Sequence, residues 1–361
     1  MYLFLAVFLS MMIYFVYFQV CKSESFINSP YNSLQDLFSD HVIRGDIVSA
    51  DGKVLATTKV SADGTQTRSY PQGRMFAHAV GYAVNGKAGL ENQENFSLLR
   101  SHEFFLKRIA DDISDKKAQG DTVVTTLDAQ IQQVAYKSLG NYQGAVIVME
   151  PDTGKIIAMV SKPDYDPNTV KKDWSSLTAE GSTVLYNRAT QGKYAPGSVF
   201  KIVTATAGLE SSKVSVNDHF NCPGFRIVED RKIRCHKVGE HGSETFKEDV
   251  MNSCNPVFMD VGARVGVDGM YQTFRQLGLF EKTGIDLPGE ASSIMHQKKN
   301  VGAVELATMS FGQSIQITPL QLLRAVSAVI NGGKLITPHF GRYVQKQDGT
   351  RLKAFFYSVK E

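Results

Sequence analysis

The sequence predicts an α+β protein with an apolar N-terminal anchor, a small α+β domain, and a larger domain of helices packed on an antiparallel sheet. Three observations support this prediction. Residues 2–20 contain no charged side chain. Residues 44–120 consist of short apolar stretches separated by Asp-Gly and Gly turns. From Asp128 onward, a helix pattern precedes two apolar strands joined by a turn, as expected where a helix covers an antiparallel hairpin.

The composition is that of a globular protein. Of the 361 residues, 43% are apolar and 21% are charged, and the net charge of +3 is small for this length. A chain of this length commonly forms two or three domains. The sequence has no Gly-rich phosphate loop, standard zinc-ligand array or basic tract. We therefore expect no cofactor and no nucleic-acid partner.

The uncharged N-terminal run predicts a membrane anchor over residues 1–21. The run is long enough to span a bilayer. A cleaved signal peptide is the alternative, but nothing basic precedes the run, and the residues around Cys21 are poor for cleavage. We expect a single-pass membrane protein whose orientation cannot be read from flanking charges.

Residues 22–120 are predicted to form a juxtamembrane stretch and a small pedestal domain. Residues 44–56 indicate two strands joined by an Asp-Gly turn, and residues 95–99 indicate a short helix. No group of residues in this unit suggests catalysis.

A second domain is predicted over residues 121–361. Asp128 is expected to cap a helix that ends at Gly140. Residues 164–187 are interpreted as a loop. The other expected elements are a buried strand at 143–149, its partner strand at 155–161, helices at 244–251, 267–277 and 318–330, and a strand–turn–strand unit at 342–361.

The stretch Tyr194–Lys201 is the centre of this domain. Pro196 and Gly197 break the preceding segment, and the following helix is apolar nearly all round, so we expect it to be buried. Because positions i and i+3 share a helical face, the Lys201 amine should lie beside the Ser198 hydroxyl. A desolvated lysine has a lowered pKa and can be the base that a serine nucleophile needs. A chance surface pair of the same spacing is the alternative.

Ser253 and Asn255 are predicted to lie on a loop between two helices. Pro256 disfavours helical geometry at Asn255 and can begin the next helix. The two polar side chains can point into a cleft, or they can cap that helix, and the local pattern alone favours the cap. Cys254 is expected to point the other way and to pack.

Two of the four cysteines flank a predicted hairpin. A disulfide between Cys222 and Cys235 is plausible if this segment lies outside the cell. His236 and His241 follow closely, so a zinc site is conceivable, although the spacing matches no standard ligand pattern.

Together these motifs resemble the active-site set of penicillin-binding proteins and serine β-lactamases. The matching residues are Ser198-Val-Phe-Lys201 and Ser253-Cys-Asn255. The stretches that resemble class B penicillin-binding proteins cover the chain from Arg44 to His339 and are Arg44-Gly-Asp-Ile, Gly89-Leu-Glu, Thr126-Leu-Asp, Asn187-Arg-Ala, Tyr194-Ala-Pro-Gly-Ser, Thr283-Gly-Ile-Asp-Leu-Pro-Gly-Glu290 and Thr318-Pro-Leu-Gln.

The resemblance implies a peptidoglycan D,D-transpeptidase outside the bacterial cell membrane, inhibited by β-lactams. Ser198 would attack the D-Ala-D-Ala carbonyl of a stem peptide, with Lys201 as base. Ser253 would relay protons toward the leaving amine, and Asn255 would hold the substrate amide. The acyl group would then pass to a second stem peptide. The implied protein partner is a glycosyltransferase of the elongation, division or sporulation machinery.

The sequence departs from the family in its third motif, Lys-Thr-Gly on an inner strand. The one such tripeptide, Lys282-Thr283-Gly284, lies in a loop that is a structural landmark in the family. Because the chain ends at Glu361, where the motif is still to come, we expect the transpeptidase-like domain to be C-terminally incomplete. The pedestal is also short, and no basic tail precedes the anchor. The alternative function is a non-catalytic, membrane-anchored scaffold of the cell-wall machinery, and a β-lactam-hydrolysing or sensing protein is a third.

Overall fold

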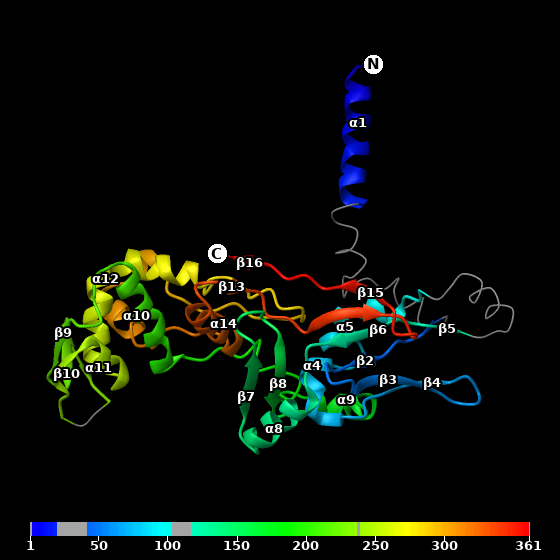
Figure 1. Cartoon of the computed structure of the whole chain (residues 1–361), viewed down its shortest axis with the longest axis horizontal. Coiled ribbons are helices and arrows are strands. Elements are labelled where there is room, and N and C mark those ends of the chain that lie inside the picture. The colour runs from blue at the N-terminus through cyan, green and yellow to red at the C-terminus, as the bar shows by residue number, and fades with distance from the viewer. Residues whose placement is uncertain (1, 20–41, 103–116, 237–238, 361) are drawn as a thin grey trace.

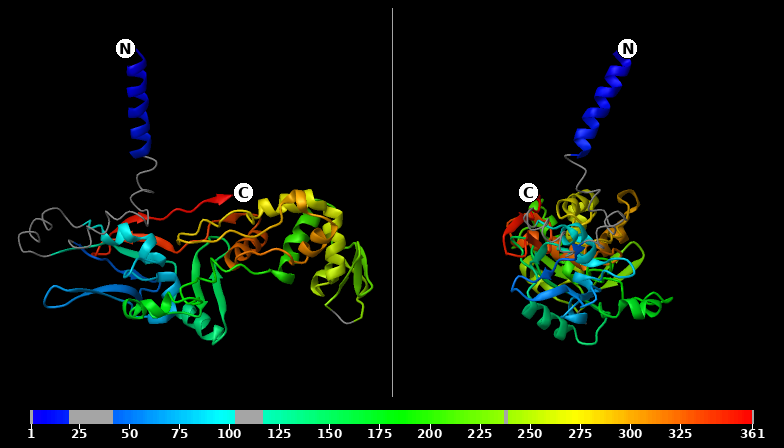
Figure 2. Two further views of the ribbon diagram at one scale, coloured as in Figure 1. Left: turned by 180° about the vertical axis from the view of Figure 1, so that it is seen from behind. Right: turned by 90° about the vertical axis from the view of Figure 1, so that its right-hand side faces the viewer.

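A computed structural model describes residues 2–19, 42–102, 117–236 and 239–360. The folded part is elongated, with a sheet-rich region at one end and a helical region at the other (Figure 1). Figure 2 shows from behind that the C-terminal strands run back along the sheet-rich region. The chain therefore crosses from the sheets to the helices and returns.

Helix α1 (Tyr2–Tyr17) falls within the predicted anchor. It carries no acidic or basic residue at either end and buries none of its side chains. None of the helices in the described ranges has both the length and the apolar character needed to cross a membrane. The predicted juxtamembrane stretch lies almost entirely outside the described residues.

A six-stranded sheet joins the pedestal to the predicted second domain, because three of its strands, at residues 122–125, 341–345 and 351–354, lie beyond the predicted boundary at residue 120. Strand β2 pairs parallel with β6, and the other neighbours pair antiparallel. The predicted strand–turn–strand units at both ends of the chain are confirmed, since β2 pairs with β3 and β14 with β15. The strand order is β15 (Arg351–Ala354), β14 (Gly341–Gln345), β6 (Thr122–Thr125), β2 (Ile47–Val48), β3 (Val54–Val60) and β4 (Gln66–Ser69).

Short helices pack on this sheet and are tied to it by a buried charge cluster. Glu91 is completely buried and accepts hydrogen bonds from Nε of Arg44 and Nε of Arg68, each at 2.6 Å. The predicted helix at 95–99 is confirmed. The helical elements of the pedestal are η2 (Gly73–Phe76), α4 (Ala77–Val80), α5 (Gly89–Gln93) and α6 (Asn95–Leu99).

A helix on a two-stranded sheet connects the pedestal to the helical region. Asp128 caps α8 (Ala129–Leu139) by accepting from the backbone N–H groups of Gln130 and Ile131, as predicted. Strands β7 (Gly144–Met149) and β8 (Ile156–Lys162) form the predicted antiparallel pair. The expectation that the first strand is buried is wrong: every β7 residue is half-buried, because β8 is its one strand neighbour among the described residues.

The interpretation of residues 164–187 as a loop is wrong in part, because they contain α9 (Val170–Leu177). Val170 is fully buried, and Trp174 lies edge-on to Tyr82 of the pedestal, with ring centroids 6.0 Å apart. The helix is thus stabilised by a contact between segments far apart in the sequence.

The helical region contains the predicted functional stretches. The predicted helices at 244–251, 267–277 and 318–330 are confirmed, the first from Phe246 onward, because residues 244 and 245 belong to a strand, and the second as the end of a longer helix that kinks at Gly266. Thr318 forms the expected capping box with Gln321. The helices are η3 (Gly197–Phe200), α10 (Lys201–Glu210), α11 (Phe246–Met251), α12 (Asn255–Gln276), η4 (Lys298–Asn300), α13 (Ala303–Met309) and α14 (Pro319–Ile330).

Small hairpins and strand pairs complete the fold. The predicted hairpin between the first two cysteines of this region is confirmed as β10 paired with β11. The remaining strands are β9 (His219–Cys222), β10 (Phe225–Val228), β11 (Arg231–Arg234), β12 (Gly242–Thr245), and the short pairs β1 (Val42–Ile43) with β5 (Ala118–Gln119) and β13 (Leu335–Ile336) with β16 (Val359–Lys360).

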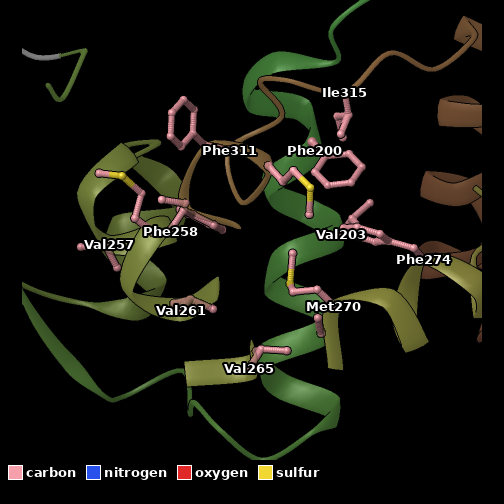
Figure 3. Packing of buried hydrophobic residues seen from close by; sticks show 14 of the residues in the cluster. Phe200, Val203, Val257, Phe258, Val261, Val265, Met270, Phe274, Phe311 and Ile315 are labelled. Atoms are coloured by element: carbon pink, nitrogen blue, oxygen red, sulfur yellow. The ribbon is translucent and has the colours of Figure 1, made fainter. Parts of the chain in front are cut away.

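Helix α10 is packed in the core of the helical region on one side. Phe200 and Val203 are completely buried against side chains of α12 that include Phe258 and Phe274 (Figure 3). The Phe200 and Phe274 rings meet edge to face with centroids 5.3 Å apart. The expectation of burial all round is wrong on the other side, where Ile202 is 37% exposed. The inward side fixes the helix in place, and it includes Lys201.

Candidate active site

Ser198 lies in a tight turn, η3, directly before α10. The turn is held from both sides by backbone hydrogen bonds. Tyr194 and Ile317 exchange a pair of bonds at 3.0 Å each, and Gly197 donates to the carbonyl of Gly312 at 2.9 Å. The Ser198 residue itself is exposed. The sequence thus places a reachable hydroxyl on a backbone that is anchored to a distant segment.

Gly312 shows how closely the two segments approach. A Cβ atom at this position would lie 2.1 Å from the carbonyl oxygen of Gly197, and the backbone has φ +80°. Only glycine adopts that conformation readily and allows that approach. The position of the serine turn therefore depends on a residue without a side chain.

The Lys201 amine is buried and makes three hydrogen bonds. Its Nζ donates to the Ser253 carbonyl at 2.6 Å, to Ser253 Oγ at 2.9 Å and to Asn255 Oδ1 at 2.7 Å. The residue is 4% exposed. Among the described residues, no hydrogen bond joins the amine to the Ser198 side chain. The structure thus brings three of the four predicted site residues into contact, with the fourth one turn away.

Burial lowers the pKa of Lys201 to about 8, because the charged ammonium is desolvated. A group with a pKa near 8 is neutral in about one molecule in ten at pH 7. A neutral amine can accept a proton, whereas an exposed lysine almost never does. The environment thus gives this lysine the property that a base requires.

The helix-cap interpretation of Ser253 and Asn255 is wrong. The residue at the N-cap of α12 is Cys254, which makes no side-chain capping bond, and Asn255 is already the first helical residue. Ser253 adopts φ +53°, which turns the chain sharply before the helix. Both polar side chains instead accept hydrogen bonds from the Lys201 amine.

The Lys282-Thr283-Gly284 tripeptide closes a loop. Thr283 donates its backbone N–H and its hydroxyl to Oε1 of Glu290, at 2.8 and 2.6 Å. Gly284 donates to the other carboxylate oxygen at 3.2 Å. Thr283 is 2% exposed. These groups make their hydrogen bonds within the loop, as expected of a segment with a structural role.

Four potential metal ligands meet next to this site. The ligand atoms of Cys222, Cys235, His241 and Cys254 all lie within 4.8 Å of one another. None of these three cysteines is in a disulfide, so the plausible disulfide between the first two is not formed. His236 is not a member of this group. Sequence reasoning missed Cys254, because the ligands come from two strand pairs and a helix start, and no local spacing connects them.

A Ser-x-x-Lys turn whose buried lysine holds a Ser-x-Asn segment is the site plan of the penicillin-recognising serine enzymes. Comparison with known proteins agrees. The profile of the penicillin binding protein transpeptidase domain matches residues 144–356, and that of the penicillin binding protein A dimerisation domain matches residues 44–123. The chain therefore belongs to the penicillin-binding proteins, and its two domains make it a class B member.

Individual relatives are similar over most of this chain. Stage V sporulation protein D of Bacillus subtilis is 35% identical over 297 residues, which cover 76% of this chain and 45% of that protein. Peptidoglycan D,D-transpeptidase MrdA of Acinetobacter baumannii is 32% identical over 321 residues, 76% of this chain and 47% of that protein. The chain thus spans about half the length of these relatives.

Solved structures share the fold. The D,D-transpeptidase domain of a peptidoglycan glycosyltransferase from Eggerthella lenta superposes with a TM-score of 0.80 at 28% identity, covering 89% of this chain and 77% of that one. Penicillin-binding protein A of M. tuberculosis, solved as an imipenem acyl-enzyme complex, gives 0.80 at 26% identity, covering 90% and 79%. The mixed helix and sheet content of a penicillin-binding transpeptidase is therefore shown for this chain.

Proposed function

We propose that this protein is a peptidoglycan D,D-transpeptidase that works through an acyl-enzyme on Ser198. The observation that carries the proposal is the buried Lys201 amine, held one turn from Ser198 by Ser253 and Asn255. An exposed hydroxyl, a neighbouring amine of lowered pKa and a polar pair beside it are the groups that acyl transfer from a peptide requires.

In the acylation step, Ser198 Oγ attacks the carbonyl carbon between two D-Ala residues of a stem peptide. Lys201 Nζ takes the hydroxyl proton as the C–O bond forms. The C–N bond then breaks, and the terminal D-Ala leaves after Ser253 Oγ delivers a proton to its nitrogen. The hydrogen bond between Lys201 and Ser253 supplies the path for that proton.

In the second step, the amine of another stem peptide attacks the ester carbonyl. Its proton returns by the same path, the C–O bond to Ser198 breaks, and a cross-link has formed. Asn255 would hold the substrate amide, and support for this role comes from its Nδ2, which makes one long bond of 3.5 Å to the Arg234 carbonyl. A β-lactam would follow the first step and leave Ser198 acylated.

The direct test is release of D-Ala from a donor pentapeptide and transfer of its acyl group to an acceptor amine. We expect release by the parent protein and none by Ser198→Ala. A folded parent that neither releases D-Ala nor forms the transfer product would favour the scaffold function instead.

We further propose that the protein is held at the bacterial cell membrane by a single-pass anchor that includes α1, with both folded domains outside. Support comes from the exposed, uncharged side chains of α1. A glycosyltransferase of the elongation, division or sporulation machinery is the proposed partner, since cross-linking acts on newly made glycan strands. Alkaline extraction should leave the protein in the membrane fraction, and deletion of residues 2–19 should release it.

A further inference from the structure

We propose that Cys222, Cys235, His241 and Cys254 bind a structural Zn²⁺ ion that fixes the Ser253–Asn255 segment beside Lys201. The proposed effect on Lys201 rests on the function proposed above, whereas the metal site itself rests on the geometry of its ligands. The four ligand atoms lie within 4.8 Å of one another, although up to 32 residues separate them in the sequence.

The fold brings these residues together from three elements. Cys222 ends β9 and pairs with Gly242 of β12, which places the preceding residue, His241, at the same end of the strand pair. The β10–β11 hairpin then returns the chain, and Cys235 donates its backbone N–H to the Gly224 carbonyl at 2.8 Å. Cys254 stands at the start of α12 and closes the set.

The distances and donor types fit zinc. Tetrahedral Zn²⁺ with bonds of about 2.3 Å to sulfur and about 2.0 Å to nitrogen holds its ligand atoms roughly 3.5–3.8 Å apart. Cys235 Sγ already lies 3.6 Å from Nδ1 of His241. The other pairs lie within 4.8 Å, so they need a contraction of at most about 1.3 Å, which a bound ion supplies by attracting the thiolates.

The surroundings indicate a structural site. Four protein ligands complete a tetrahedral shell and leave no position for water, which is typical of zinc sites that stabilise a fold. Cys222 and Cys254 are completely buried, Cys235 is nearly so, and His241 is half-buried. Three thiols cannot all pair with one another as disulfides, whereas one metal ion uses them all.

The position of Cys254 links this ion to the proposed active site. Cys254 is flanked by Ser253 and Asn255, and both neighbours accept hydrogen bonds from the Lys201 amine. Its backbone N–H also donates to the Asp249 carbonyl at 3.0 Å. A metal bond to its sulfur would hold the middle of this tripeptide in place. The ion is therefore a positioning element and takes no part in the acyl transfer.

The test measures bound metal in the full chain expressed with added zinc. We expect one zinc per chain, and the intense visible absorption of tetrahedral, thiolate-bound Co²⁺ after exchange. His241→Ala and Cys222→Ser should lose the metal. His241→Cys, which keeps a ligand, should retain it even if the alanine variant folds poorly. His236→Ala is the matched control and should bind zinc as the parent does.

Three results would overturn the proposal: a parent without zinc, equal loss of zinc in the His236 and His241 variants, or a Cys222–Cys235 disulfide in the purified protein. Ser198→Ala should bind zinc normally, so failure of the metal site and failure of the proposed enzyme function are separate outcomes. The proposed effect of the zinc ion on the Ser253–Asn255 segment is tested by a separate measurement. Loss of zinc should slow acylation by a β-lactam by roughly 10- to 100-fold, the range seen when the support of a site is removed.

Discussion

Replacing Glu91 with glutamine should destabilise the folded protein by about 3–5 kcal/mol, the cost typical of removing one partner from a buried ion pair. Glu91 is fully buried and is shared by Arg44 and Arg68. At a charge separation of about 4 Å and an effective dielectric constant of about 20, each pair contributes roughly 4 kcal/mol of attraction. Glutamine would leave two buried guanidinium groups without a counter-charge.

The pH dependence gives the same prediction a second readout. Burial acts to raise the pKa of Glu91, but Arg68 and Arg44 outweigh it and hold the pKa below the ordinary value of 4.5. A carboxyl group whose folded-state pKa is lowered stabilises the fold above its unfolded pKa, and that contribution is lost as the pH falls through the folded value. The parent should therefore lose stability on acidification below about pH 5, and Glu91→Gln should lose less.

The assay is urea unfolding followed by circular dichroism, with Glu150→Gln as the matched control. Glu150 also pairs with a cation, Lys155 at 2.9 Å, but both side chains are more than 40% exposed. An exposed pair contributes at most about 1 kcal/mol. Equal destabilisation by the two substitutions would refute the reasoning, because it would show that burial of the Glu91 cluster has no energetic consequence.

Three further predictions concern the candidate site. Lys201→Ala should slow β-lactam acylation by about 100- to 10,000-fold. The acylation rate of the parent, measured by stopped flow, should rise with pH with a midpoint near 8, because the neutral amine is the base. An acylation rate independent of pH would contradict this role. Gly312→Ala should lower the free energy of unfolding by at least about 2 kcal/mol and reduce β-lactam labelling of Ser198. Gly349 has an equally positive φ but open space around it, so Gly349→Ala should cost only about 1 kcal/mol in thermal unfolding. Removing zinc with a chelator should lower the melting temperature of the parent and leave that of Cys222→Ser unchanged; equal shifts in both would contradict the metal site.

Local sequence signals predicted the elements whose ends are set by nearby residues. Asp128 and Thr318 cap their helices as expected, because a cap bonds to backbone groups two or three residues away. The Asp-Gly turns predicted the strand pairs at both ends of the chain for the same reason. By contrast, α9 (Val170–Leu177) depends on contact with Tyr82, which its own segment does not reveal.

The site was predictable in part. The spacing of Ser198 and Lys201 predicted one helical turn, but the contact between Lys201 and the Ser253–Asn255 segment spans more than 50 residues and depends on the packing of α10 against α12. Local pattern even favoured a helix cap at that segment. The role of Cys254 was likewise hidden, because a ligand set drawn from separate elements has no sequence period.

The most direct test of the account is the covalent reaction of Ser198 with a β-lactam. The folded chain would be incubated with a fluorescent penicillin, digested, and analysed by mass spectrometry, with Ser198→Ala treated in parallel. The account predicts one adduct per chain, located on the peptide that contains Ser198, and no adduct on the variant. An adduct on another residue, equal labelling of the variant, or no adduct on a folded parent would contradict it.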